Sequence, residues 1–174
     1  MKNQHKILPA TLLDTTEIVA LINKAYRGET SKKGWTTEAD LLGGIRTDDE
    51  SLKEILNDEN SVFLKYTDDE NKIAGCIHLQ QQKQKLYVGM LTVDPEIQNK
   101  GIGKALLQAA DSYAVQNNFH KIIMTVISVR EELIDWYQRH GYKKTGETKP
   151  FPMNNEKFGL PKQQLEFIVL EKTI

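Results

Sequence analysis

A strand-type run, a turn with two glycines and an amphipathic helix follow one another between residues 86 and 116. Residues 86–93 form an extended apolar run that ends at Asp94 and Pro95, because the residue before a proline is biased away from the helical conformation. The helix expected over residues 103–116 carries its apolar side chains on one face, so that face packs against a sheet. A chain built around this unit folds as layers of helix and sheet rather than as a helical bundle or a sandwich of two sheets.

Helix-type and strand-type patterns also alternate along the rest of the chain. Pairs of capping residues three positions apart predict helices that begin near Asp14, Thr47 and Ser128. Apolar runs predict strands over residues 61–66, 72–80, 122–127, 142–147 and 164–171. The pattern therefore predicts an α/β fold of the α+β kind, in one domain over residues 1–174.

The charge balance and the composition exclude several classes of protein. Lys and Arg together number 23 and Asp and Glu 24, so the chain lacks the basic excess expected of a nucleic-acid-binding protein. The single cysteine, Cys76, cannot form an internal disulfide, and no Cys/His spacing is typical of a zinc site. No segment has the apolar core of a signal peptide or the ~20 apolar residues of a spanning helix. We therefore expect a cytoplasmic protein with no metal site and no nucleic-acid or membrane partner.

Gly101 and Gly103, with Lys100 and Lys104 beside them, form a candidate phosphate-binding turn. The glycines remove side chains that would keep an anion away from the backbone, and the following helix offers unpaired N–H groups and the positive end of its dipole. A Walker A loop is excluded, because the glycine spacing differs and no Ser or Thr follows Lys104. A Rossmann fingerprint is excluded, because residues 122–127 do not lead into an acidic residue. Two interpretations stay open, a pyrophosphate site and an ordinary glycine-containing turn.

The sequence QNKGIG, from Gln98 to Gly103, resembles the Q/R-x-x-G-x-G/A signature of the GNAT superfamily of N-acetyltransferases. The strand before it, the amphipathic helix after it, the β-branched strand at residues 122–127 and the segment WYQRHGY at residues 136–142 occur in the order that this family uses. The resemblance covers roughly residues 61–142. The residues before that fit only as the family's variable acceptor-side helices.

This resemblance implies a mixed, strongly twisted central sheet with helices on both faces, splayed between residues 86–93 and 122–127. It implies that acetyl-CoA binds in that gap as co-substrate and that the enzyme transfers the acetyl group directly to an amine. Tyr137 corresponds to the family's usual general acid, which protonates the departing thiolate. The other implied site residues are those that offer backbone groups to the pantetheine arm (Leu91, Thr92 and Val93) and those that surround the pyrophosphate (Asn99, Lys100, Gly101, Ile102, Gly103 and Lys104).

Two residues of the same region have alternative interpretations. Without the resemblance, Tyr137 is a core aromatic residue beside Trp136 on the inner face of its helix. The family often has Asn seven residues before this Tyr, where the present chain has Arg130. Arg130 would pair with a carboxylate of the acceptor or a phosphate of CoA, or it is an exposed arginine that pairs with Glu131 or Glu132 or with nothing.

Neither the general base nor the acceptor can be identified from the sequence. Glu29, Glu38 and Asp40 lie in the irregular segment expected to face the acceptor, and a His or a chain of waters are further candidates for the base. The near-neutral charge favours no class of amine; we expect a small molecule ahead of a protein, and a homodimer stays open. The alternative functions are a non-catalytic CoA-binding sensor or interaction module, and a nucleotide-binding α/β domain.

Overall fold

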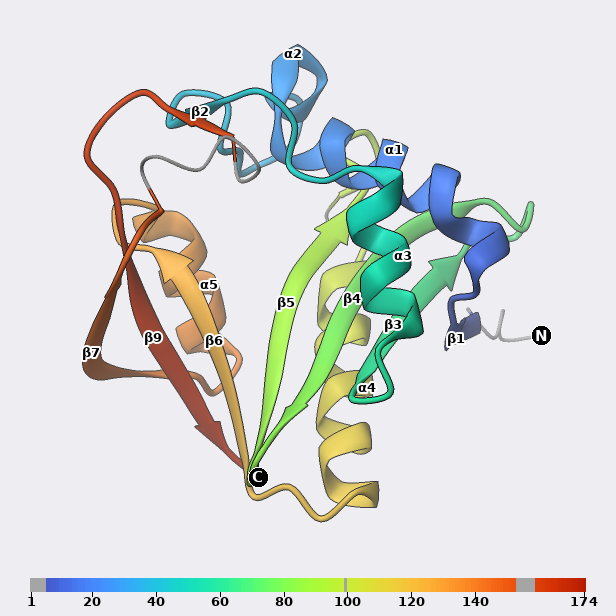
Figure 1. Ribbon diagram of the computed structural model, residues 1–174, viewed down its shortest axis with the longest axis vertical. Helices are drawn as coiled ribbons and strands as arrows, with labels where there is room; N and C mark the ends of the chain where they lie inside the picture. The colour runs from blue at the N-terminus through green and yellow to red at the C-terminus, as the bar shows by residue number, and fades with distance from the viewer. Residues whose placement is uncertain (1–5, 99, 153–158) are drawn as a thin grey trace.

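The computed structural model describes residues 6–98, 100–152 and 159–174, and its centre is a seven-stranded sheet (Figure 1). The strands lie in the order β1-β3-β4-β5-β6-β9-β7, and within the described sheet only β5 and β6 run parallel to each other. Their bounds are β1 Lys6–Pro9, β3 Ser61–Thr67, β4 Ile73–Gln82, β5 Lys85–Val93, β6 Lys121–Ile127, β7 Lys143–Pro150 and β9 Glu166–Thr173. Two short strands, β2 (Leu42–Gly43) and β8 (Leu160–Pro161), pair separately.

Helices cover both faces of the large sheet, as expected for the mixed fold. The helices are α1 Thr15–Tyr26, α2 Gly28–Ser31, α3 Asp49–Asn57, α4 Ile102–Gln116 and α5 Glu131–Arg139, with a short 3₁₀ turn at Leu12–Asp14. Phe63 and Cys76 belong to the core under α1 and α3, whereas their neighbours Leu64 and Ile77 belong to the core under α4 and α5. Neighbouring side chains on β3 and β4 therefore contribute to two apolar cores, one on each face of the sheet. None of the described helices combines the length and apolarity needed to cross a bilayer.

The sheet opens between β5 and β6, near its middle (Figure 1). These two strands pair only where Leu86 faces Ile122 and Tyr87 faces Ile123, and they diverge beyond that point. On its other side β5 carries a bulge, because two residues of β5 but only one of β4 lie between successive pairs. Met90, inside the bulge, has a positive φ of 50°. The bulge and the divergence together leave the second half of β5 facing a gap in the sheet.

Several local features differ from the sequence predictions; for example, the N-cap of α3 is Asp48, the residue after Thr47. The helix predicted from Ser128 begins at Glu131, with Arg130 at its N-cap position. The pairs β1–β3 and β2–β8 were not predicted, because strands of two to four residues owe their extended form to a distant partner and leave no periodic pattern.

Candidate active site

The turn between β5 and α4 is shaped so that a ligand can approach its backbone. Gly101 directly precedes α4 and has a left-handed backbone (φ 78°), which favours glycine. A Cβ on Gly103 would lie 3.3 Å from the Trp136 ring, so a larger residue there would press against α5. The N–H groups in the first turn of a helix have no acceptor within the helix, and this first turn carries no acidic side chain. The turn therefore presents N–H donors and the positive end of a helix dipole to an anion.

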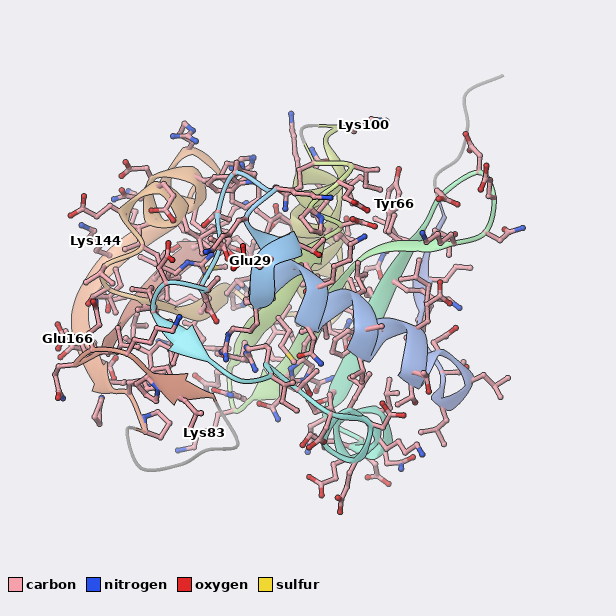
Figure 2. The ribbon with its side chains drawn as sticks, turned by 90° about the horizontal axis from the view of Figure 1, so that it is seen from above. Glu29, Tyr66, Lys83, Lys100, Lys144 and Glu166 are labelled. Atoms are coloured by element: carbon pink, nitrogen blue, oxygen red, sulfur yellow. The ribbon has the colours of Figure 1, made fainter. Side chains whose placement is uncertain are left out.

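The polar side chains at this turn are of two kinds: Gln98 forms hydrogen bonds within the protein, and two lysines are exposed. The Gln98 side chain accepts a hydrogen bond from the Trp35 backbone N–H at 2.9 Å and donates one to the Val93 carbonyl at 3.3 Å. Lys100 and Lys104 are exposed, and neither forms an ion pair with another residue that the structure describes. Figure 2 shows Lys100 at the outer edge of the molecule, next to the start of α4. Asn99, the remaining predicted residue of the turn, lies outside the described residues.

Most of the predicted site residues line one cavity of about 280 Å³, which lies between the end of β5, this turn and α5. They are Leu91, Thr92, Val93, Gly101, Ile102, Gly103, Lys104 and Tyr137. Lys100 is at the turn but does not line the cavity. The cavity wall also contains Trp35 and Trp136, whose ring centroids are 5.9 Å apart. The structure thus brings residues from both sides of the β5–β6 gap around one space.

Tyr137 is both a core residue and a lining residue of this cavity. Its ring packs edge-on against Trp136 and Tyr142, with centroids 5.2 and 5.8 Å away, and it is buried. Burial raises the pKa of Tyr137 well above 10, so the phenol is neutral at physiological pH. In the described part of the chain no hydrogen bond uses its hydroxyl. A neutral phenol whose hydroxyl forms no hydrogen bond with the described residues is in the protonation state that a general acid requires.

Tyr26 of α1 is a site residue that the sequence analysis did not single out. Its hydroxyl donates a hydrogen bond of 2.7 Å to the backbone carbonyl of Leu91, inside the β5 bulge. Burial raises the pKa of Tyr26 to about 12, which keeps this donor protonated. The bond fixes the backbone of the bulge at the edge of the cavity, on the side of β5 where the described pairing with β6 ends at Tyr87.

Arg130 takes part in a buried ion-pair cluster that crosses the gap. One guanidinium nitrogen of Arg130 lies 3.1 Å from Glu38, and the Nε of Arg27 lies 3.0 Å from the other oxygen of the same carboxylate. Arg130 also donates to the Thr36 hydroxyl at 2.8 Å, and that hydroxyl donates to Glu132 at 2.9 Å. Of the alternatives left open for Arg130, the exposed arginine is therefore wrong, because the side chain is buried. Sequence reasoning missed the cluster because Glu38 lies 92 residues before Arg130.

A second cavity, of about 330 Å³, lies on the other side of Tyr137 and Leu91, which line both cavities. Of the three carboxylates predicted as candidate bases, only Glu38 lines it, and both Glu38 oxygens already accept hydrogen bonds from arginines. Glu29 and Asp40 are exposed near Lys32 and line neither cavity. The geometry therefore assigns Glu38 to holding the cluster together and provides no carboxylate that is free to accept a proton in the described site.

Comparison with known proteins gives one family. A family model described as "Acetyltransferase (GNAT) domain" matches residues 39–153. Human N-acetyltransferase 8B is 26% identical over 125 residues, which make up 68% of this chain and 54% of that protein. Human N-acetyltransferase 8 matches over the same lengths at the same identity. The chain thus spans about half the length of these curated relatives.

Solved structures share the fold at low sequence identity. The ribosomal-protein-S18-alanine N-acetyltransferase of Escherichia coli superposes with a TM-score of 0.72 at 13% identity, covering 98% of this chain and 94% of that one. A Bacillus anthracis structure described as a streptothricin acetyltransferase in complex with acetyl coenzyme A has a TM-score of 0.58 at 20% identity, covering 70% and 67%. These likenesses support the mixed sheet that the sequence predicted.

Proposed function

This chain belongs to the GNAT acetyltransferase family, and on that premise we propose that it transfers the acetyl group of acetyl-CoA directly to an amine. The family uses acetyl-CoA as the acetyl donor, and one structural neighbour was solved with acetyl coenzyme A bound. The activity of this chain, its site residues and its acceptor are parts of the proposal.

The residues of the first cavity fit the donor. A pyrophosphate needs backbone N–H groups and positive charge without side chains in the way, and the turn at Gly101 and Gly103 offers the first while Lys104 adds the second. The cavity continues along Leu91 to Val93, at the open edge of β5, where an extended pantetheine arm can bond to the backbone as a strand would. The thioester would then lie near the bulge and Tyr137.

The proposed reaction is a single displacement at the thioester carbonyl. A neutral amine attacks the carbonyl carbon and forms the new C–N bond, and a backbone N–H at the Leu91 bulge stabilises the negative charge that develops on oxygen. The C–S bond then breaks and Tyr137 gives its proton to the departing thiolate. The amine loses its extra proton to solvent or to the regenerating tyrosinate, so atoms and charges balance over the cycle.

One observation carries the proposal: the glycine turn and the neutral phenol of Tyr137 line the same cavity in the gap between β5 and β6. A CoA-binding module without catalysis would need the turn alone. The second cavity beyond Tyr137 gives an acceptor its own place and favours catalysis over binding only.

The direct test is an acceptor screen. Purified protein is incubated with acetyl-CoA and single amines, CoA thiol release is followed with a thiol reagent, and acetylated products are identified by mass spectrometry. We expect release that depends on the amine, with a matching product 42 Da heavier, the mass of an acetyl group replacing hydrogen. Tight acetyl-CoA binding by calorimetry with no product from any amine would support the binding module instead.

A further inference from the structure

Three of the four arginines of the chain, Arg27, Arg46 and Arg130, gather beside the second cavity. The other Lys and Arg residues of the chain are lysines, apart from the fourth arginine, Arg139, which is exposed on α5. Arginine differs from lysine in presenting a planar fork of donors that matches carboxylate and phosphate oxygens. The concentration of arginine at one cavity therefore needs a reason beyond solubility.

The described residues do not neutralise this charge. Glu38 is the acidic residue that lines the cavity among the described residues, and its two oxygens are shared between Arg27 and Arg130. Arg46 is half-buried and has no ion-pair partner in the described part of the chain. The Nε–H of Arg130 is buried and has no hydrogen-bond partner there either. Glu38 thus pairs with two of the guanidinium groups, and the Arg46 guanidinium and the Arg130 Nε–H remain as positive charge and unused donors beside the cavity, without a hydrogen-bond partner among the described residues.

Arg46 lies close to the point where acetyl transfer is proposed. Its guanidinium carbon is 5.5 Å from the centroid of the Tyr26 ring. The hydroxyl of that ring donates to the Leu91 carbonyl in the β5 bulge. Arg46, Tyr26 and Leu91 also line the same second cavity, so one small molecule in that cavity can reach both Arg46 and the bulge.

We infer that the acceptor is a small amine that also carries an anionic oxygen group, a carboxylate or a phosphate, and that Arg46 binds this group while the amine points to the β5 bulge. The inference rests on the proposed acetyl transfer and adds the chemical class of the acceptor. Arg130, fixed by Glu38 and Thr36, supplies the remaining positive field. A polyamine or a basic peptide would meet like charge at this cavity and is disfavoured.

The experiment compares amines in pairs that differ only in the acidic group. Suitable pairs are tyrosine with tyramine, phenylalanine with phenethylamine, and phosphoethanolamine with ethanolamine; spermidine and a lysine-rich peptide represent the cationic acceptors. For the preferred pair we expect kcat/KM at least about 10-fold higher for the anionic member, since a charge-assisted bond to arginine is lost in the other. Preference within the first two pairs identifies a carboxylate, and preference within the third a phosphate.

Arg46 variants test the assignment to this residue. Arg46→Gln should raise the KM of the anionic acceptor by about 10-fold or more and abolish the preference within the pair, and Arg46→Lys should restore part of it. Arg139→Gln, which removes the same charge from an exposed site outside both cavities, is the matched control and should leave the preference unchanged.

The outcomes separate this inference from the proposed function. If cationic or uncharged amines are acetylated as well as the anionic ones, or instead of them, the inference is overturned while acetyl transfer stands. If Arg46→Gln weakens acetyl-CoA binding in calorimetry and leaves the acceptor preference intact, the arginine serves the donor and the inference is overturned. If acetyl-CoA does not bind to the wild-type protein, the proposed function fails and the inference fails with it.

Discussion

Replacing Glu38 with Gln tests whether the buried cluster holds the two halves of the sheet together. Glu38 accepts from Arg27 at 3.0 Å and from Arg130 at 3.1 Å, and all three side chains are buried. Gln keeps the shape and one acceptor oxygen but removes the negative charge, so two guanidinium groups lose their counter-charge inside the protein. Breaking a buried ion pair by removing one partner costs about 3–5 kcal/mol. Gln retains one acceptor, so the expected loss is at the low end of this range, about 3 kcal/mol.

The free energy of unfolding, measured by urea titration with fluorescence detection, gives this loss directly. For a chain of this size each 1 kcal/mol corresponds to about 2–4 °C in melting temperature, so the variant should melt about 6–12 °C lower than wild type. Glu29→Gln is the matched control, because Glu29 is exposed and its one ion pair within the described residues is with Lys32. This variant should have the melting temperature of the wild type. A Glu38→Gln protein as stable as wild type would refute the reasoning, since it would mean that water already neutralises the cluster.

Two further predictions concern the donor turn and the pH dependence of stability. Gly103→Asp should weaken acetyl-CoA affinity in calorimetry by about 10-fold or more, ~1.4 kcal/mol, because it places a negative charge at the helix N-terminus. Gly103→Ala is the control, since its Cβ meets the same Trp136 ring without adding a charge. Equal losses of affinity in the two variants would contradict the electrostatic account. Burial lowers the pKa of His78 to about 4, so only the unfolded chain takes up a proton at this residue between pH 6.5 and 4, and the stability contributed by its neutral form is lost as pH falls through that window. His78 should account for about 2 kcal/mol of the loss between pH 7 and pH 5 in urea titrations, and a His78→Gln protein with the same pH dependence as wild type would contradict this.

The order of elements and the glycine turn could be predicted from the sequence because their causes are local. The apolar face of α4, the two glycines before it and the β-branched run of β6 each leave a pattern within a few residues of sequence. The strands β3 and β4 were likewise predicted from short apolar runs, and the structure buries every residue of β4 from Ile73 to Leu79 because both faces of the sheet are covered there.

The acceptor side could not be predicted, because its features join residues that are far apart. The bond from Tyr26 to Leu91 spans 65 residues, and no local pattern marks a tyrosine on an apolar helix face as a donor to a distant carbonyl. Arg130 was singled out as a departure from the family pattern, but its partner in Glu38 depends on how a long irregular segment crosses the gap. In the β5 bulge the positive φ belongs to Met90 and not to the neighbouring Gly89, and a methionine gives no sequence signal for that conformation.

Substituting Tyr137 with Phe tests the central claim most directly, namely that the cavity between β5 and β6 carries out acetyl transfer with this residue as the acid. The variant keeps the ring that packs against Trp136 and Tyr142 and removes only the proton donor. With a saturating amine, kcat should fall by about 10² or more, while acetyl-CoA affinity and melting temperature stay close to wild type. A folded Tyr137→Phe protein that turns over at the wild-type rate would contradict the account and leave Tyr137 as a core residue only.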